Sequence, residues 1–261
     1  MPSQPQLQSK IPVLDHGYVE YVGHYGSDED IIRAARMSTG KGFQGWGPTP
    51  NCKHCGAHIE SENLLTSNAC IKSQHDFSGD EKLLAYLWKN QHTSPFEMAG
   101  LTIEVQAPIM VFREYFRHRT LSFNEFSARY AELPDLFYIP SIERLKNGAQ
   151  AKTNKQASEG GISEDTANCL QEAIKSSCEA SRASYEALLT QGLSRELSRL
   201  VIPVSQYSRA RISGNLLNQL KFLKLRLGAG VQWEMKEYAK AVAVLVKELY
   251  PRTYTLFEES L

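Results

Sequence analysis

The sequence lacks an excess of charge of either sign, because its 261 residues contain 29 lysines and arginines and 29 aspartates and glutamates. A protein that binds a long polyanion mainly through electrostatic attraction presents a broad positive surface. The balance therefore argues against nucleic acid as the main partner. It leaves room for a small pocket that is basic only locally.

Long apolar runs are also missing. No stretch approaches the roughly 18 apolar residues that a membrane-spanning helix needs. The first ten residues, MPSQPQLQSK, lack the apolar centre of a signal peptide. We therefore expect a cytoplasmic protein without a membrane partner. Residues 1–11 are interpreted as a disordered tail and residues 12–261 as one domain.

Cysteine is scarce, and the five cysteines are an odd number, which argues against a disulfide framework and suits a reducing compartment. Three of them lie with a histidine in an insertion at about residues 43–79: Cys52, Cys55, Cys70 and His75. The spacing C-x2-C…C-x4-H is compatible with a tetrahedral structural zinc site, for which His54 and His58 are competing ligands. A surface loop with reduced thiols, or a zinc-knuckle interaction module, would explain the same pattern.

Hydrophobic periodicity predicts a helix-rich α+β fold with one small antiparallel sheet. Helices are expected at 27–38, 79–91, 108–119, 163–190, 194–201, 215–227 and 231–250. A strand or hairpin with a turn at His16-Gly17 is expected at 13–22, and residues 101–108 alternate as a half-buried strand. Residues 147–162 are polar and indicate a loop.

The stretch FRHRTLSFNEFSARY (116–130) concentrates the polar chemistry of the chain. Three cationic or titratable residues at a helix end have a simple structural explanation, since they compensate the helix dipole. Arg119, however, is expected on the apolar side of that helix, where a guanidinium needs an anionic partner. The following residues add groups that can hydrogen-bond an anion: Ser122, Asn124, Glu125, Ser127 and Arg129. Together they suggest a pocket for a phosphorylated ligand.

A second group of cations follows far along the chain: Arg199, Arg209, Arg211 and Arg226. Arg226 stands between Leu225 and Leu227, where an arginine that extends along the surface would also fit. Known nucleotide loops are absent, because there is no G-x-x-x-x-G-K-S/T and LGAG (227–230) follows a helix. Neither Ser122 nor Ser127 has the G-x-S-x-G context of a hydrolase nucleophile.

Arg117-His118-Arg119, with Ser127 eight residues after Arg119, resembles the R-H-R-x7-S signature of the flavin-dependent thymidylate synthases. Other segments resemble that family in the same order along the chain: RAARMS (33–38), HTSPFEM (92–98), FYIPSIERL (137–145), SRLVIPVSQYSR (198–209) and LKLR…QWE (223–234). The resemblance covers most of the chain outside the tail, the cysteine insertion and residues 147–162.

This resemblance implies the fold of that family and an FAD-dependent methyltransferase that converts dUMP to dTMP. It further implies that methylenetetrahydrofolate donates the carbon, that FAD carries the hydride and that NADPH reduces the flavin. No protein side chain is expected to attack uracil covalently. The resemblance also implies a homotetramer whose active sites are shared between subunits.

The resemblance assigns roles to individual positions. It implies FAD contacts for His92, Ser94, Arg117, His118, Arg119, Glu125, Asn215 and Lys221. It implies dUMP contacts for Glu114, Glu125, Ser127, Arg129, Arg199 and Arg226, with Arg199 reaching the phosphate from a neighbouring subunit. Arg226 is the implied catalytic residue, because a cation beside the pyrimidine stabilises the N3-deprotonated uracil and makes its C5 more nucleophilic.

Two positions depart from the family pattern. Glu114 stands where glutamine is frequent, and its carboxylate must either turn away from a bound phosphate or pair with an arginine. Lys221 stands where asparagine or histidine is common. The alternative function, from another class, is a single-stranded nucleic-acid binding module that uses Arg117–Tyr130, with its aromatic rings as a stacking platform.

Overall fold

The computed structural model describes residues 9–47, 52, 78–152 and 158–261. The chain divides into two compact units. The first consists of Met1–Gly23, Leu101–Gly214 and Asn218–Leu245, and the second of His24–Gly100, Asn215–Leu217 and Val246–Leu261. No helix among the described residues is long and apolar enough to cross a membrane.

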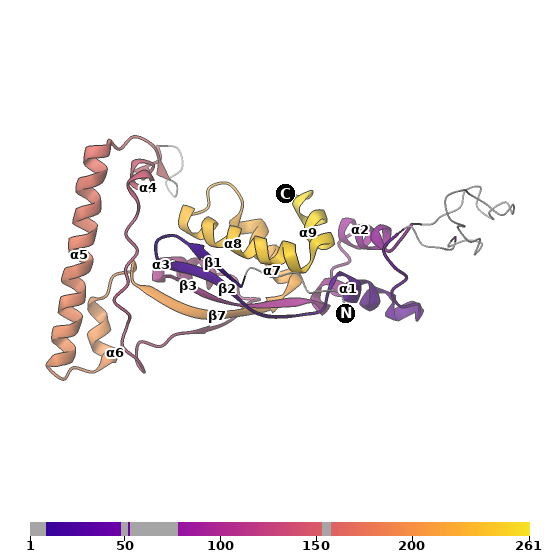
Figure 1. Cartoon of the computed structure of the whole chain (residues 1–261), viewed down its shortest axis with the longest axis horizontal. Helices are drawn as coiled ribbons and strands as arrows, with labels where there is room; N and C mark the ends of the chain where they lie inside the picture. The colour runs from indigo at the N-terminus through magenta and orange to yellow at the C-terminus, as the bar shows by residue number, and fades with distance from the viewer. Residues whose placement is uncertain (1–8, 48–51, 53–77, 153–157) are drawn as a thin grey trace. The chain divides into compact units, whose positions relative to one another are not determined.

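A five-stranded sheet forms the centre of the first unit (Figure 1). Its strands are β1 (Lys10–Val13), β2 (Gly17–Tyr25), β3 (Gly100–Pro108), β4 (Ser122–Glu125) and β7 (Tyr207–Asn215), in the order β1-β2-β3-β7-β4. β1 and β2 form an antiparallel hairpin, and β4 runs antiparallel to β7 with Asn124 opposite Arg211. The predicted hairpin is confirmed, but its turn lies at residues 14–16, because Gly17 already belongs to β2.

Alternation along β3 gives the sheet two different faces. Leu101, Ile103 and Val105 are buried, whereas the residues between them are partly exposed. On the apolar side lie the helices α7 (Leu216–Arg226) and α8 (Trp233–Leu249) (Figure 1). The Tyr238 hydroxyl of α8 donates to the carbonyl oxygen of Gln106 at 2.8 Å. The sheet and these helices therefore share the core of the unit.

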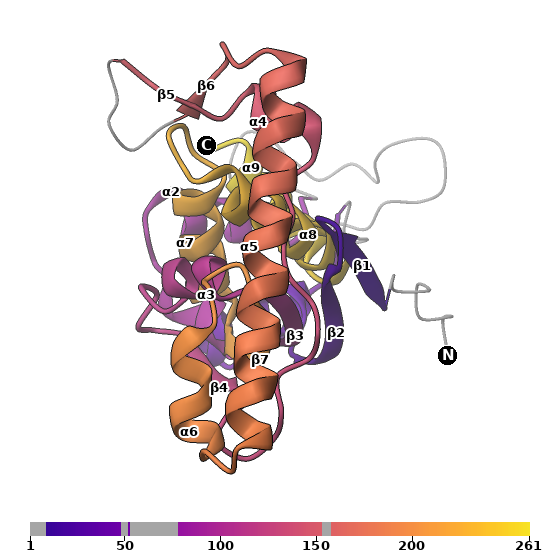
Figure 2. The same cartoon turned by 90° about the vertical axis from the view of Figure 1, so that its left-hand side faces the viewer.

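A long helix, α5 (Glu164–Thr190), lies in the first unit with the short α6 (Arg195–Ser198) beside its C-terminal part (Figure 2). Ser163 caps α5, since its hydroxyl accepts from the Thr166 N–H at 3.2 Å. The helix ends before Gly192, whose φ of 85° suits glycine. The remaining elements of this region are α4 (Ile142–Lys146), β5 (Ala149–Gln150), β6 (Ser158–Glu159) and the 3-10 turn η3 (Arg199–Val201).

The second unit is mainly helical. It contains α1 (Asp28–Ala35), η1 (Arg36–Thr39), α2 (Glu81–Lys89), η2 (Ser94–Met98) and α9 (Pro251–Glu258). The buried Asp28 joins α1 to α9, because its carboxylate accepts from the hydroxyl of Thr253 at 2.6 Å and from the N–H of Arg252 at 2.9 Å. Burial raises the pKa of Asp28, and these hydrogen bonds oppose the rise.

The base of the cysteine insertion is held together by Asp80. Its fully buried carboxylate contacts the Arg36 guanidinium and accepts from the Gln44 N–H at 2.7 Å. The Asp80 N–H donates to the Gly45 carbonyl oxygen at 2.9 Å, and the Gly47 N–H donates to Glu81 Oε2 at 2.9 Å. The two ends of the insertion therefore meet at one place.

The predicted helix-rich α+β class is confirmed, as are the helices at 27–38, 79–91, 163–190, 194–201, 215–227 and 231–250 to within a few residues. One local prediction was wrong. α3 (Ile109–Tyr115) ends before the signature, so Arg119 is an exposed turn residue and is not on its apolar side. The elements that were not predicted include the strands at 122–125 and 207–215, and α9, which begins at Pro251 as a helix can.

Candidate active site

The signature segment is a tight turn between α3 and β4. Tyr115 ends α3, and its ring stacks on Phe222 of α7 with a centroid distance of 4.9 Å and an interplanar angle of 11°. The His118 ring meets Phe222 edge-on, also at 4.9 Å. Phe222 is fully buried. One apolar ring of α7 therefore fixes both the end of α3 and the central histidine of the signature.

Arg226, the last residue of α7, reaches the same turn. Its Nε donates to His118 Nε2 at 2.8 Å. Its Nη1 donates to Glu114 Oε2 at 2.7 Å, and its Nη2 donates to the Glu114 carbonyl oxygen at 2.9 Å. The Arg226 side chain is only 16% exposed. Of the two alternatives for Glu114, the structure shows the second: its carboxylate pairs with an arginine.

Burial and the neighbouring Arg226 cation lower the pKa of His118 from 6.5 to about 4, and Glu114 opposes this change. The imidazole is therefore neutral at pH 7, which agrees with Nε2 accepting a hydrogen bond. Burial also raises the pKa of the Tyr115 hydroxyl. The site thus presents one held cation, Arg226, beside a neutral imidazole.

Around this centre stand cations without partners. The side chains of Arg117, Arg119 and Lys221 are exposed, and none forms an ion pair or hydrogen bond within the described part of the chain. Lys221 lies one turn of α7 after Asn218, whose amide donates to the Thr120 carbonyl oxygen at 3.4 Å. These three cations therefore lie near the signature turn and remain available to an anionic ligand.

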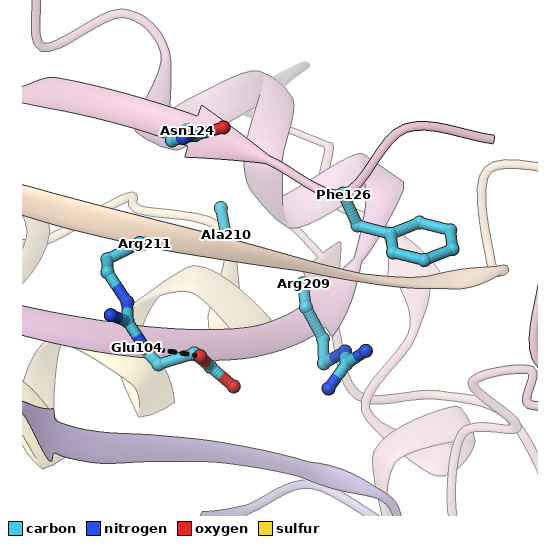
Figure 3. A pocket seen from close by; sticks show the side chains of 6 residues that line it. All are labelled: Glu104, Asn124, Phe126, Arg209, Ala210 and Arg211. Atoms are coloured by element: carbon cyan, nitrogen blue, oxygen red, sulfur yellow. Dashed lines mark hydrogen bonds and ion pairs between the residues drawn. The ribbon is translucent and has the colours of Figure 1, made fainter. Parts of the chain in front are cut away.

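A hollow of about 340 Å³ opens on the polar face of the sheet (Figure 3). Glu104, Asn124, Phe126, Arg209, Ala210 and Arg211 line it. Figure 3 shows the two arginines extending from β7 on the side of Glu104, and Arg211 Nη2 lies 3.2 Å from Glu104 Oε2. Although burial opposes it, hydrogen bonds from Tyr18 and Arg211 lower the pKa of Glu104.

A second hollow of about 190 Å³ shares Phe126 and Arg209 with the first. Its other lining residues are Gln106, Glu132, Pro134, Tyr207 and Ser208. The Arg209 guanidinium lies 5.9 Å from the centre of the Phe126 ring. Both hollows are therefore lined by the chain just after β4 and by β7.

Other signature residues lie in the same unit. Glu125 accepts from the hydroxyl of the buried Ser208 at 2.9 Å. The Ser127 hydroxyl accepts from the Arg129 N–H at 3.3 Å, and the exposed Arg129 side chain lies 3.5 Å from Glu196. These contacts fix the loop after β4.

Comparison with known proteins places this geometry in a family. The family model described as "Thymidylate synthase complementing protein" matches residues 20–252. A flavin-dependent thymidylate synthase of Thermus thermophilus is 39% identical over 251 residues, which cover 96% of this chain and 79% of that protein. One from Anaplasma marginale is 36% identical and covers 97% of this chain and 76% of its own length. The chain belongs to the flavin-dependent thymidylate synthase family.

Solved structures agree with this assignment. A crystal structure of a UMP/dUMP methylase from Streptomyces cacaoi, bound with 5-Br UMP, is similar with a TM-score of 0.73 and 30% identity. It covers 95% of this chain, and this chain covers 97% of it. As a member of the flavin-dependent thymidylate synthase family, the protein is a methyltransferase.

Of the site residues that the sequence predicted, the structure brings Glu114, His118 and Arg226 into contact, and most of the others belong to the same unit. Glu114, Arg117, His118, Arg119, Glu125, Ser127, Arg129, Arg199, Lys221 and Arg226 all lie in the first unit. Arg199 is exposed in η3, without a partner among the described residues. Their assigned roles remain predictions.

Three predicted flavin contacts belong to the second unit. His92 is exposed, with its ring edge-on to Tyr86 at 5.6 Å. Ser94 begins η2, and Asn215 ends β7.

Of the candidate zinc ligands, only Cys52 lies among the described residues, where it is buried and forms no disulfide bond. Cys55, Cys70 and His75 lie outside them. No group of histidine, cysteine and acidic side chains in the described part of the chain could hold a metal ion.

The sequence pattern did not reveal Glu104, which lines the larger hollow, or Phe222, whose ring contacts Tyr115 and His118. Glu104 lies on the polar side of β3, and the alternation of that strand could have indicated it. Arg209 and Arg211 were grouped only as cations. Their alternation with Ala210 and Ile212 was the available signal for a strand that presents both guanidinium groups on one face.

Proposed function

We propose that this protein converts dUMP to dTMP, with methylenetetrahydrofolate as carbon donor, FAD as hydride carrier and NADPH as reductant. In the overall reaction, dUMP, methylenetetrahydrofolate, NADPH and one proton give dTMP, tetrahydrofolate and NADP⁺. Family membership supports the reaction type, and the related Streptomyces cacaoi enzyme is named a UMP/dUMP methylase.

The observation that carries the proposal is the position of Arg226. A residue that lies 108 positions after His118 contacts that histidine through its guanidinium. The guanidinium has five N–H donors, and three are used by His118 and Glu114. Two donors therefore remain for a ligand, one on each Nη.

Arg226 supplies the electrostatic part of the mechanism. A guanidinium that faces the pyrimidine stabilises the negative charge that develops when uracil loses its N3 proton. The charge spreads into the ring and makes C5 more nucleophilic toward the methylene carbon. His118 is neutral and does not compete as a second cation.

Ser127 has a binding role in this proposal. Its hydroxyl accepts from the Arg129 N–H and remains able to donate to a phosphate oxygen. No described histidine, lysine or carboxylate is hydrogen-bonded to it as a base would be. The proposed reaction therefore proceeds without a covalent protein nucleophile.

The residues fit an FAD. Its diphosphate needs cations with free donors, and Arg117, Arg119 and Lys221 are exposed without partners in the described chain. When bound, FAD supplies the hydride that reduces the transferred carbon to a methyl group. The protein then has the tasks of holding dUMP, orienting Arg226 and excluding water.

We further propose a homotetramer in which Arg199 reaches the dUMP phosphate of a neighbouring subunit. Arg199 is exposed, and the neighbouring Leu197 and Leu200 are 49% and 77% exposed. A cation flanked by exposed leucines suits a contact that is both apolar and phosphate-binding. Mixing inactive Arg199→Ala and Arg226→Ala subunits should restore part of the activity if the sites are shared.

The decisive experiment measures dTMP by mass spectrometry with FAD, NADPH and isotopically labelled methylenetetrahydrofolate. Labelled dTMP supports the proposal, and UMP is tested in parallel because the related methylase is named for both nucleotides. Arg226→Ala should nearly abolish dTMP formation while flavin binding persists. Wild-type protein that retains no flavin and binds oligonucleotides with a steep salt dependence would instead support the nucleic-acid binding alternative.

A further inference from the structure

Arg226 is held at all three of its guanidinium nitrogens. Nε contacts His118, while Nη1 and Nη2 both contact Glu114, through its carboxylate and its carbonyl oxygen. Three contacts of this kind fix both the plane of the guanidinium and its rotation within that plane. Glu114 makes two of the three.

The carboxylate is the only charged acceptor among these contacts. All three bonds are strengthened by the charge of the guanidinium, and the bond to the carboxylate is the one that joins two ionised groups. Arg226 is the last residue of α7 and is 16% exposed, beside the stacked rings of Tyr115 and Phe222. Without an acceptor for Nη1, a guanidinium in this place would gain by turning toward water.

The arrangement also leaves the reactive side of Arg226 open. Glu114 occupies one hydrogen on each Nη, so the second hydrogen on each Nη is available. The pairing at the same time neutralises the carboxylate that would otherwise repel a nucleotide phosphate. An acidic residue at this position is thus compatible with a nearby nucleotide site.

We propose that Glu114 is a positioning residue that fixes the Arg226 guanidinium in the orientation used on the pyrimidine. This inference rests on the proposed function, since it concerns the residue assigned to uracil polarisation. Glu114 acts through Arg226 and does not itself touch the reacting atoms.

Two substitutions distinguish the effect of the orientation of Arg226 from the effect of the charge at position 114. Glu114→Ala removes the Nη1 acceptor, and Arg226 is expected to turn away. Glu114→Gln keeps an acceptor oxygen on a side chain of the same length, so Arg226 is expected to keep its orientation. With dUMP, Glu114→Ala should lower kcat by about 10- to 100-fold with a much smaller change in KM, the scale expected from misplacing a catalytic group. Glu114→Gln should keep most of kcat.

His118 reports on Arg226 independently of activity. In the wild-type protein the Arg226 cation lowers the pKa of His118 and Glu114 raises it. If Arg226 leaves in Glu114→Ala, the pKa of His118 should rise from about 4. If Arg226 stays in Glu114→Gln, the pKa should fall, because only the contribution of the carboxylate is lost. The two variants therefore shift His118 in opposite directions.

The test is a histidine-labelled NMR titration of the flavin-loaded enzyme, together with kcat and KM for dUMP. Glu237→Ala is the matched control, since it removes a helix carboxylate 2.6 Å from Lys240, away from this site, and should leave both readouts unchanged. If Glu114→Ala does not fold, Glu114→Asp replaces it, because its shorter carboxylate cannot reach Nη1 and should also reduce kcat.

Unchanged kcat in Glu114→Ala, or a fall of the His118 pKa in both variants, would overturn the proposal, since Arg226 would then keep its place without the carboxylate. Failure of the proposed function looks different. The wild-type enzyme would form no dTMP, while the opposite His118 shifts would still show that Glu114 positions Arg226.

Discussion

Replacing Arg144 by methionine removes the partner of a buried carboxylate. Arg144 Nε lies 2.8 Å from Glu234 Oε1, and the two side chains are 17% and 4% exposed. The Tyr138 hydroxyl donates to the same oxygen at 3.2 Å. Arg144→Met leaves Glu234 with this phenol alone, and a buried charge that loses its partner is costly.

The expected loss is about 3–5 kcal/mol of unfolding free energy, the scale for breaking a buried ion pair from one side. For a chain of this size each kcal/mol corresponds to roughly 2–4 °C in Tm, so the midpoint should fall by about 6–20 °C. Arg144→Met combined with Glu234→Gln removes both charges and keeps an acceptor for Tyr138. That double variant should recover most of the loss.

Thermal and urea unfolding, followed by tryptophan fluorescence, would measure these differences. Trp233 lies beside the pair, with its ring 5.6 Å from the Arg144 guanidinium. Arg195→Met is the control, because its pair with Glu132 spans 3.5 Å between side chains that are 45% and 60% exposed. An exposed pair contributes only about 0–1 kcal/mol. The reasoning fails if Arg144→Met is no more destabilising than Arg195→Met, or if the double variant is as unstable as the single one.

Three further outcomes are expected. The pKa of His118 lies near 4 in the folded protein and near 6.5 when unperturbed, so the unfolded chain binds a proton first as the pH drops. The unfolding free energy of the wild-type protein should therefore fall relative to that of His118→Gln between pH 6.5 and pH 4. Urea midpoints of the two proteins that change in parallel over this range would contradict the reasoning. Gly17→Ala places a Cβ 2.6 Å from the Val13 carbonyl oxygen and should lower the unfolding free energy by about 1–3 kcal/mol. Gly23→Ala is the control, because its Cβ meets nothing within 4 Å. Equal unfolding midpoints for the two variants would refute the steric argument. Ser127→Ala should raise KM for dUMP yet retain measurable turnover, and complete loss of chemistry with dUMP still bound would reopen a nucleophilic role.

The helices could be predicted because their signals are local. Ser27 and Ser163 accept hydrogen bonds as N-caps, and Gly192 follows the end of α5, each within a few residues of the pattern it bounds. β4 and β7 were missed because their polar residues obscured the alternation. The Arg209 and Arg211 side chains are exposed on one face, so a strand with charged side chains on every second position was interpreted only as a group of cations.

The site residues could be named through the resemblance, but their contacts could not. Arg226 and Glu114 are 112 positions apart, and nothing local to either residue indicates the other. Two of the segments that resemble the family have a structural role in this protein, unlike the signature. FYIPSIERL and QWE meet at the buried pair of Arg144 and Glu234, so these segments stabilise the first unit.

The base of the cysteine insertion has a consequence for how the chain tolerates change in length. Gly47 and Gly79 approach so closely that a Cβ on Gly47 would lie 3.0 Å from the Gly79 Cα, and Asp80 fastens the adjoining backbone from its buried position. The backbone on the two sides of this point, near Gly47 and near Gly79, is therefore fastened directly by contacts between the two sides. A longer connection between two ends that are already joined costs little, about 0.6 kcal/mol for each doubling of its length. A change in the number of residues between Gly47 and Gly79 should accordingly leave the spacing of α1 and α2 unaltered.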